Sequence, residues 1–143
     1  LDLIDDSYNA NPTSMAAALE VLASAEVTND IGRVSKGRRI AYLGDMKELG
    51  PDEIALHVGL ARLPCIADID VIHCIGPMMR ALYDALPEAQ RGEWFETSQD
   101  AASRLKTHLD SGDVVLAKGS LSMKLALIVE GIRKMGQAPL DEE

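Results

Sequence analysis

The stretch Asp5-Asp6-Ser7-Tyr8-Asn9-Ala10-Asn11-Pro12 marks the point where a short apolar run gives way to a helical pattern. Residues 1–4 before it predict a strand, and the Ala-rich residues after Pro12 predict a helix. Asn11 is expected to be the N-cap of that helix and Pro12 its first residue. Two interpretations stay open, a well-capped turn or a ligand site, since a helix N-terminus offers unpaired N–H groups and partial positive charge.

Strand and helix patterns alternate along the rest of the chain. Apolar runs predict further strands at residues 39–43, 70–75, 93–96 and 114–117. Helical spacing predicts helices at residues 12–26, 51–65, 78–86, 98–109 and 121–132. Because the strands are apolar rather than alternating, both faces of the sheet should be covered. The sequence therefore predicts a single α/β domain over residues 1–135, doubly wound and Rossmann-like with a mainly parallel sheet and helices on both faces, followed by a frayed polar tail at 136–143.

The composition restricts the classes of partner. With 143 residues, 47% of them hydrophobic, the chain is long enough for one domain with a substantial core. Its formal charge of −9 argues against a nucleic-acid or anionic-membrane surface, because such partners are bound through clustered Lys and Arg. The one basic cluster, Lys36, Arg38 and Arg39, is expected to be solvated.

The sequence also indicates a cytoplasmic protein. No apolar run is long enough to span a bilayer, and no signal-peptide pattern is present. Cys65 and Cys74 lack metal-ligand and redox spacing, which fits buried thiols in a reducing compartment. Because the chain begins without Met and inside an apolar run, we expect it to be a fragment of a longer protein.

Polar junctions follow three of the predicted strands, at residues 5–11, 44–50 and 118–122. They should share one crevice, because ligands of such folds bind outside the carboxyl ends of the strands. For Asp45, anchoring of its loop is favoured over contact with a ligand. Lys118-Gly119-Ser120 offers a cation, a flexible backbone and a hydroxyl at a helix start. A carboxylate or phosphate site and a plain strand-to-helix turn are equally supported there.

No pattern indicates chemistry carried out by this chain alone. Neither a G-x-G-x-x-G fingerprint nor a Walker loop is present, so no dinucleotide or triphosphate cradle is expected. His57, His73 and His108 lack metal-ligand spacing, and we expect His57 to pack beneath a loop and His108 to be exposed. Asp5 and Asp6 are adjacent in a strand and point to opposite faces, which prevents a carboxylate dyad. We therefore expect no catalytic residue and no metal ligand.

Three motifs together resemble the C-terminal domain of the Mur ligases. They are Asp-Ser-Tyr-Asn-Ala-Asn-Pro at residues 6–12, Leu-Gly-Asp-Met-Lys-Glu-Leu-Gly at 43–50 with His57 shortly after, and Lys-Gly-Ser-Leu-Ser at 118–122. The first motif is similar to the member that adds D-alanyl-D-alanine to the UDP-MurNAc-tripeptide in peptidoglycan precursor synthesis. The resemblance implies a cytoplasmic three-domain amide ligase whose central ATPase domain is this chain's partner. ATP and Mg²⁺ are held mainly there, so no cofactor is expected in this chain.

The same resemblance implies roles for individual residues. Those expected at the adenine and ribose of the nucleotide, or at the closing interface, are Asp6, Tyr8, Asn9 and Asn11. Those expected near the dipeptide or its carboxylate are Lys118, Ser120, Ser122 and Asp45. The family commonly carries an Arg after Lys-Gly-Ser, where this sequence has Leu121. The domain is expected to act by closure, which positions substrates and excludes water from a hydrolysable acyl phosphate, and to be inactive alone.

Two alternatives stay open. The chain is a non-catalytic small-molecule-binding or interaction module of Rossmann-like fold, or it is the C-terminal domain of a related ligase such as folylpolyglutamate synthetase. The start inside a strand argues against the first alternative. The Ser-Tyr-Asn-Ala-Asn-Pro stretch argues against the second.

Overall fold

Five parallel strands form one sheet in the computed structural model, which describes residues 1–7, 9–31 and 36–141, with residues 136–141 described by their backbone alone. The strands are β1 (Asp2–Asp6), β2 (Arg39–Gly44), β3 (Val71–Ile75), β4 (Arg91–Phe95) and β5 (Val114–Lys118). Their spatial order is β1-β5-β2-β3-β4, and every neighbouring pair runs parallel. The predicted parallel sheet is confirmed, with β1 and β4 at its edges.

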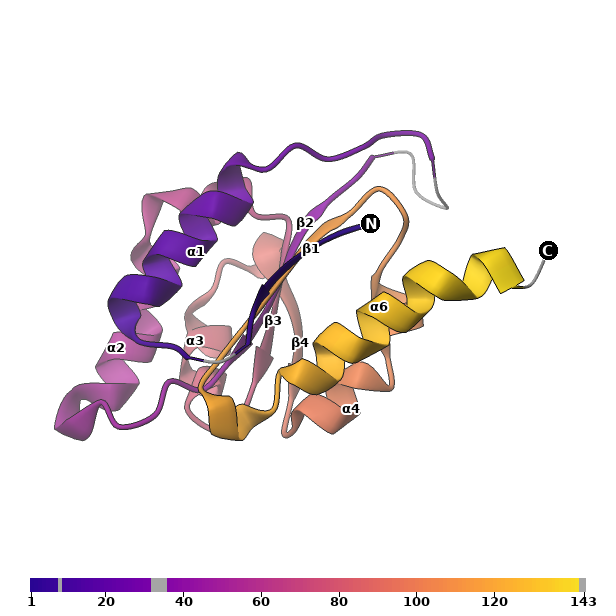
Figure 1. Ribbon diagram of the computed structural model, residues 1–143. Helices are drawn as coiled ribbons and strands as arrows, with labels where there is room; N and C mark the ends of the chain where they lie inside the picture. Colours follow the sequence, from indigo (N-terminus) through magenta and orange to yellow (C-terminus); the bar gives the residue numbers. More distant parts are fainter. Residues whose placement is uncertain (8, 32–35, 142–143) are drawn as a thin grey trace.

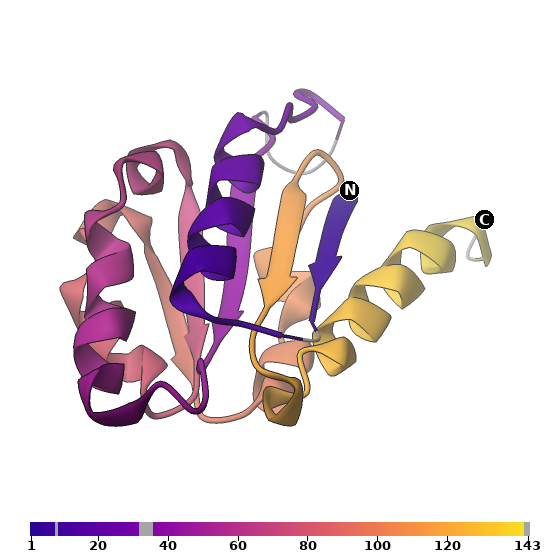
Figure 2. The ribbon, with the colours of Figure 1, turned by 60° about the vertical axis from the view of Figure 1, so that its left-hand side comes forward.

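Helices cover both faces of this sheet (Figures 1 and 2). One face carries α1 (Pro12–Ser24), α2 (Glu53–Gly59) and α3 (Met79–Ala85), and the other carries α4 (Ser98–Ala102), α5 (Leu105–His108) and α6 (Ala126–Asp141). Short 3-10 helices lie between them: η1 (Gly50–Asp52), η2 (Leu60–Arg62), η3 (Pro64–Asp68), η4 (Glu88–Gln90) and η5 (Leu121–Met123). The doubly wound arrangement is therefore confirmed.

The central strands are apolar because each of their faces is buried against helices. Successive residues of β2 point to opposite faces. Ala41 and Leu43 pack in the core beneath α1, whereas Ile40 and Tyr42 pack in the core beneath α6. A central strand of this fold therefore has no solvent-facing row in which polar residues would alternate with apolar ones.

The start of α1 agrees with the expected cap. Asn11 Oδ1 accepts a hydrogen bond from the Ser14 N–H at 2.8 Å, and Ser14 Oγ accepts one from the Asn11 N–H at 3.1 Å. This reciprocal pair is a capping box, which satisfies two N–H groups that have no partner within the helix. Pro12 occupies the first turn, where its missing N–H costs nothing.

Three predicted helices differ from the structure. The helix predicted at 51–65 is α-helical only in α2 and continues as the 3-10 helices η2 and η3, with η1 before it. The helix predicted at 98–109 is divided into α4 and α5, where the Ser103 hydroxyl donates to the Asp100 carbonyl at 2.7 Å and competes with the helical ladder. Leu121, expected in the buried stripe of the last helix, lies in η5 and is 67% exposed. Lys124 adopts the left-handed conformation, with φ of 59°, and this residue separates η5 from α6. The helical period therefore does not continue from Leu121 into α6.

The C-terminal helix is longer than expected. Its helical backbone continues to Asp141, beyond the boundary predicted at residue 135. That boundary and the fraying of the end stay predictions, and residues 142–143 lie outside the described part. Within the described residues, no helix is both long enough and apolar enough to cross a membrane.

Two residues of the basic cluster are not simply solvated, contrary to expectation. Arg38 forms an ion pair with Asp113 at 3.0 Å and donates to the His108 carbonyl at 3.1 Å. Arg39 Nε donates to the Ala25 carbonyl at 2.9 Å. These guanidinium groups satisfy a buried carboxylate and two chain carbonyls at the amino end of the sheet, because Arg has several donors in a planar fork.

The prediction that His108 is exposed is also wrong. Its ring lies 4.5 Å from the ring of His73, and its Nε2 lies 2.6 Å from a carboxylate oxygen of Glu93. The ring centroid of His73 is in turn 4.6 Å from that of Tyr42. Because α5 is short, its last residue folds back onto β3 and β4 rather than continuing a solvent-facing helix.

Candidate functional site

The sheet topology opens a crevice around the carboxyl end of β5. The loop after β5 leads to α6 on one face of the sheet, whereas the loops after its neighbours β1 and β2 lead to α1 and α2 on the other face. Such a divergence marks the ligand crevice of open α/β sheets. Lys118 pairs in register with Asp6 of β1 and with Leu43 of β2. The three predicted polar junctions therefore lie side by side at this edge.

Lys118 is buried under the crevice, where it holds the surrounding loops in place. The residue is 1% exposed, and its Nζ lies 2.6 Å from Asp6 Oδ2 and donates to the Asn9 carbonyl at 2.9 Å. A buried ammonium requires such partners because its desolvation is costly. The predicted nucleotide residue Asp6 and the predicted substrate residue Lys118 are thus bonded to each other. Together they hold the loop that carries Asn9.

Asp45 anchors the turn between β3 and α3. Its carboxylate is fully buried and accepts the N–H groups of Met79 at 2.7 Å and Met78 at 3.2 Å. Gly76 has a φ of 107°, and a Cβ there would lie 2.5 Å from Asp45 Oδ1, so only glycine lets the turn pass this close. This geometry supports the anchoring role. Contact of Asp45 with a ligand stays a prediction.

The loop after β2 is held from two sides. His57 is buried, and its Nε2 accepts the Met46 N–H at 2.9 Å. The proton of the ring must then be on Nδ1, which lies 2.6 Å from the Glu53 carbonyl. Ser120 Oγ accepts the Lys47 N–H at 2.9 Å from the opposite side. The expectation that His57 packs beneath a loop is confirmed, and the loop is preorganised by two neutral side chains.

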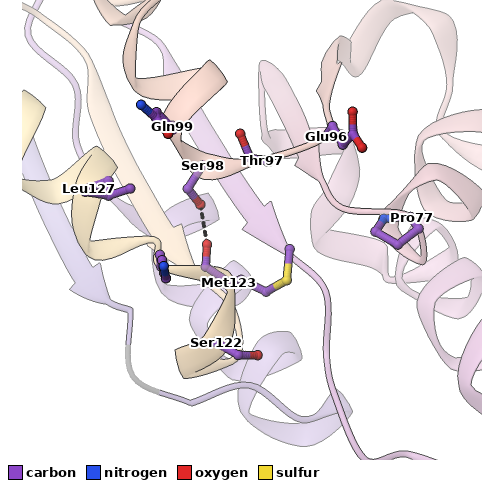
Figure 3. Close-up of a pocket in the computed structure, with 9 residues that line it drawn as sticks. Pro77, Glu96, Thr97, Ser98, Gln99, Ser122, Met123 and Leu127 are labelled. Carbon is purple, nitrogen blue, oxygen red and sulfur yellow. Dashed lines mark hydrogen bonds between the residues drawn. The ribbon is translucent and has the colours of Figure 1, made fainter.

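Two hollows lie at this edge of the sheet, and Ser122 lines both. The first hollow has a volume of about 570 Å³ and is lined by Asn9, Ala10, Lys47, Glu48, Ser120, Leu121 and Ser122. The second hollow has a volume of about 370 Å³ and is lined by Pro77, Glu96, Thr97, Ser98, Gln99, Ser122, Met123, Lys124 and Leu127 (Figure 3). We call them the first hollow and the second hollow.

The first hollow brings together only part of the predicted site. Asn9, Ser120 and Ser122 line it, whereas Asp6, Lys118 and Asp45 are bonded to other parts of the chain as described above. Asn11 is occupied as the cap of α1, and Tyr8 lies outside the described residues. Of the predicted residues, Asn9, Ser120 and Ser122 therefore line the surface of the first hollow. Asp6, Lys118 and Asp45 instead hold neighbouring parts of the chain in place.

The second hollow was not predicted from the sequence. The Thr97 side chain accepts the Asp100 N–H at 3.2 Å and caps α4, but no motif in the sequence indicated that this loop forms a wall of the crevice. Ser98 Oγ donates to the Met123 carbonyl at 2.6 Å and ties the loop after β4 to η5 (Figure 3). The sequence did contain a signal for this wall. Residues 96–99 follow a predicted strand, so they lie at the same edge of the sheet as the other polar junctions.

Three titratable groups with strongly shifted pKa values lie in the core. Burial lowers the pKa of His73 to about 3, with His108 and Arg38 as further causes, and it raises the pKa of Tyr42 and of Cys74. These side chains are buried within the sheet layers and line neither hollow. Shifted pKa values indicate function where they coincide with a cleft. The shifted pKa values of these three groups therefore do not mark the crevice.

Comparison with known families identifies the domain. The family described as "Mur ligase, glutamate ligase domain" matches residues 1–121. The chain belongs to this family. A UDP-N-acetylmuramoyl-tripeptide--D-alanyl-D-alanine ligase from Escherichia coli (strain K12) is 34% identical over 136 residues, which cover 94% of this Mur ligase domain and 27% of the relative. The enzyme of the same name from Bacillus subtilis (strain 168) is 32% identical over 135 residues, which cover 92% of this Mur ligase domain and 28% of that relative.

Solved structures agree with this assignment. A crystal structure of MurF from Acinetobacter baumannii matches with a TM-score of 0.69 and 27% identity, covering 92% of this Mur ligase domain and 28% of that chain. A MurF ligase from Thermotoga maritima, solved in complex with ADP, matches with a TM-score of 0.71 over 92% of this domain and 28% of that chain. At 24% identity, the second likeness supports the fold alone. This Mur ligase domain thus spans little more than a quarter of the relatives it matches.

Proposed function

We propose that this Mur ligase domain is the C-terminal, closing domain of a cytoplasmic ATP-dependent ligase that joins D-alanyl-D-alanine to the UDP-MurNAc-tripeptide in peptidoglycan precursor synthesis. The observation that carries the proposal is the 34% identity over 136 residues with a relative whose name states these two substrates. The crevice supports it, because two hollows with polar walls lie where ligands of this fold bind.

The described residues of this chain do not form a site for Mg²⁺ and a triphosphate. Among the described residues, no group of three or more His, Cys, Asp or Glu is arranged to hold a metal ion, and the sequence contains no Walker loop. ATP would supply the phosphoryl group that activates the carboxylate of the tripeptide. We assign Mg²⁺ and the phosphates to a central ATPase domain, which is the partner of this chain in the whole protein.

The first hollow is proposed to meet the adenosine end of the nucleotide, and the dipeptide is proposed to reach it only at the wall that the two hollows share. Asn9 is exposed at its rim, and Lys118 holds the Asn9 carbonyl from below. Asp6, Tyr8 and Asn11 complete the proposed nucleotide loop. Ser120 and Ser122 are proposed to contact the dipeptide, with Lys118 and Asp45 keeping their loops in place.

Catalysis by this domain would then consist of positioning. The loops after β1, β2 and β5 are tied to one another through Lys118 and Ser120, so they can approach the central domain as one rigid edge. Closure of such an edge orients the amine toward the activated carboxylate and excludes water. In this mechanism the ammonium of the dipeptide loses a proton before it attacks, and no residue of this chain forms a covalent bond with a substrate.

The whole protein tests the proposal directly. It should release ADP and form the amide product only when the tripeptide precursor and D-alanyl-D-alanine are both present. This chain alone should form no product. Absence of dipeptide-dependent ADP release by the whole protein would overturn the proposed reaction. Product formation by the isolated chain would overturn the closure mechanism.

A further inference from the structure

We infer that the second hollow binds the zwitterionic amine substrate, with Lys124 holding its carboxylate and Glu96 holding its ammonium group. The inference rests on the proposed function and assigns one substrate to a place in the crevice. It names residues that no motif or comparison singled out.

The size and lining of the second hollow suit a small dipeptide. Its volume of about 370 Å³ lies at the lower end of the range of about 300–1,000 Å³ for small-molecule pockets. Pro77, Met123 and Leu127 supply apolar surface, onto which two methyl side chains can pack. Thr97, Gln99 and Ser122 supply hydrogen-bonding groups. A pocket of this kind binds a ligand with short apolar side chains and a polar backbone.

The charges of the second hollow are of both signs and come from different elements. Glu96 lies after β4 and Lys124 lies between η5 and α6. Figure 3 shows Glu96 and Pro77 on one side of the hollow and Leu127 on the other. In the described part of the chain, neither Glu96 nor Lys124 has an ion-pair partner, and both residues are exposed. A ligand with an ammonium at one end and a carboxylate at the other complements both charges.

The other lysines of the crevice are already engaged. Lys118 is buried and bonded to Asp6, and Lys47 Nζ lies 3.9 Å from Asp45 Oδ2. Among the described residues that line the two hollows, Lys124 is therefore the exposed cation that has no ion-pair partner. A carboxylate entering the crevice gains most from this ammonium, because a charge-assisted hydrogen bond is stronger when the donor has no competing partner.

The backbone presents Lys124 in a fixed position. Its φ of 59° is uncommon for a residue other than Gly, Asn or Asp, and its N–H donates to the Leu121 carbonyl at 3.1 Å. Ser98 holds the preceding carbonyl, that of Met123, at 2.6 Å. A Cβ at Gly119 would lie 2.8 Å from Leu125 Cδ2, so the glycine at this position allows Leu125, the residue after Lys124, to pack closely against the end of β5. The backbone at Lys124 is thus held by its own hydrogen bond and by the bond of Ser98 to the preceding carbonyl.

Two substrates and a charge-removing variant test the assignment in the whole protein. D-Alanyl-D-alanine and its C-terminal amide differ only in the carboxylate. With the unaltered protein, KM for the amide should be about tenfold higher than KM for the acid, which corresponds to one charge-assisted hydrogen bond. Lys124→Gln should raise KM for the acid about tenfold and leave KM for the amide unchanged. Lys124→Arg should restore the preference for the acid.

A second variant and a control complete the test. Glu96→Gln should raise KM for the dipeptide about tenfold while KM for ATP stays unchanged, because it removes the partner of the ammonium group. Lys36→Gln removes the same charge at an exposed position outside both hollows and should leave both KM values unchanged. If Lys124→Gln retains the full preference for the acid, the assignment is wrong. If the unaltered protein turns over neither substrate, the proposed function itself is wrong.

Discussion

Lys118 Nζ lies 2.6 Å from Asp6 Oδ2, and this contact joins β5 to the edge strand β1 at their carboxyl ends. The two partners differ in their surroundings. The side chain of Lys118 is 2% exposed, whereas the side chain of Asp6 is 44% exposed. In this ion pair the cation is therefore buried, whereas the carboxylate is in contact with solvent.

The first prediction concerns this asymmetry. Asp6→Ala leaves a buried ammonium whose remaining described partner is the Asn9 carbonyl, so it should lower the free energy of unfolding by about 3 kcal/mol. Lys118→Met leaves a carboxylate that water can reach, so it should lower it by about 1 kcal/mol. Urea denaturation of the chain measures both values. A larger loss for Lys118→Met than for Asp6→Ala would contradict this expectation.

The second prediction concerns the anchor of α3. Asp45→Ala leaves the N–H groups of Met78 and Met79 without their buried acceptor and should lower the free energy of unfolding by about 2–3 kcal/mol. Asp84→Ala is the matched control, because it removes an exposed carboxylate paired with Arg80 and should change stability by less than about 0.5 kcal/mol. Thermal unfolding of the two variants makes the comparison. Equal losses would remove the anchoring role from Asp45.

The third prediction concerns pH. Burial, with smaller effects of His108 and Arg38, lowers the pKa of His73 to about 3 in the folded chain, against about 6.5 in the unfolded chain. Between these values the unfolded chain binds more protons at this residue. The stabilisation is complete above pH 6.5 and is lost as the pH falls toward 3, by about 1.4 kcal/mol per pH unit from His73 alone.

His73→Asn isolates this contribution. The Asn side chain can keep the acceptor that His73 Nδ1 offers to the Glu93 N–H at 3.0 Å, but it does not titrate. Urea denaturation at pH 7 and pH 4.5 should therefore show a smaller loss of stability on acidification for the variant than for the unaltered chain. Carboxylates that titrate in both proteins cancel in this comparison. An equal loss in the two proteins would show that His73 does not contribute.

The fourth prediction separates the two serines of the first hollow. Ser120→Ala removes the acceptor of the Lys47 N–H and should lower the free energy of unfolding by about 1 kcal/mol. Ser122→Ala, at an exposed residue that lines both hollows, should leave stability within about 0.5 kcal/mol and raise KM for the dipeptide in the whole protein. Unfolding curves and steady-state kinetics distinguish the two roles. A stability loss for Ser122→Ala alone would reverse them.

The fold was predictable because its signals are local. The apolar pattern of a strand such as β3 extends over only a few residues, and so does the helix start at Asn11 and Pro12. A chain that alternates such strands with helices can adopt few topologies. Leu121 was placed wrongly because a periodic pattern was extended across Lys124. A left-handed residue interrupts a helix without changing the spacing of apolar side chains in the sequence.

The site was less predictable because its contacts are distant in the chain. Lys118 and Asp6 are 112 residues apart, and only the register of β1 against β5 brings them together. The sequence shows a lysine and an aspartate after two strands, each of which fits a ligand contact. It does not show which strands are neighbours. The burial of Lys118 and its bond to Asp6 therefore emerged only from the sheet order.

The place of β1 at the edge of the sheet has a consequence for aggregation. Within the described strands β1 pairs only with β5, so its other row of N–H and C=O groups is open to a strand from a second molecule. The sequence of β1, Asp-Leu-Ile-Asp-Asp, places acidic side chains on both faces of this edge strand, with Asp2 and Asp6 on one face and Asp5 on the other. Two such strands brought together would oppose carboxylate against carboxylate. The acidic residues that hold Lys118 and Arg133 within the molecule therefore also discourage growth of the sheet between molecules.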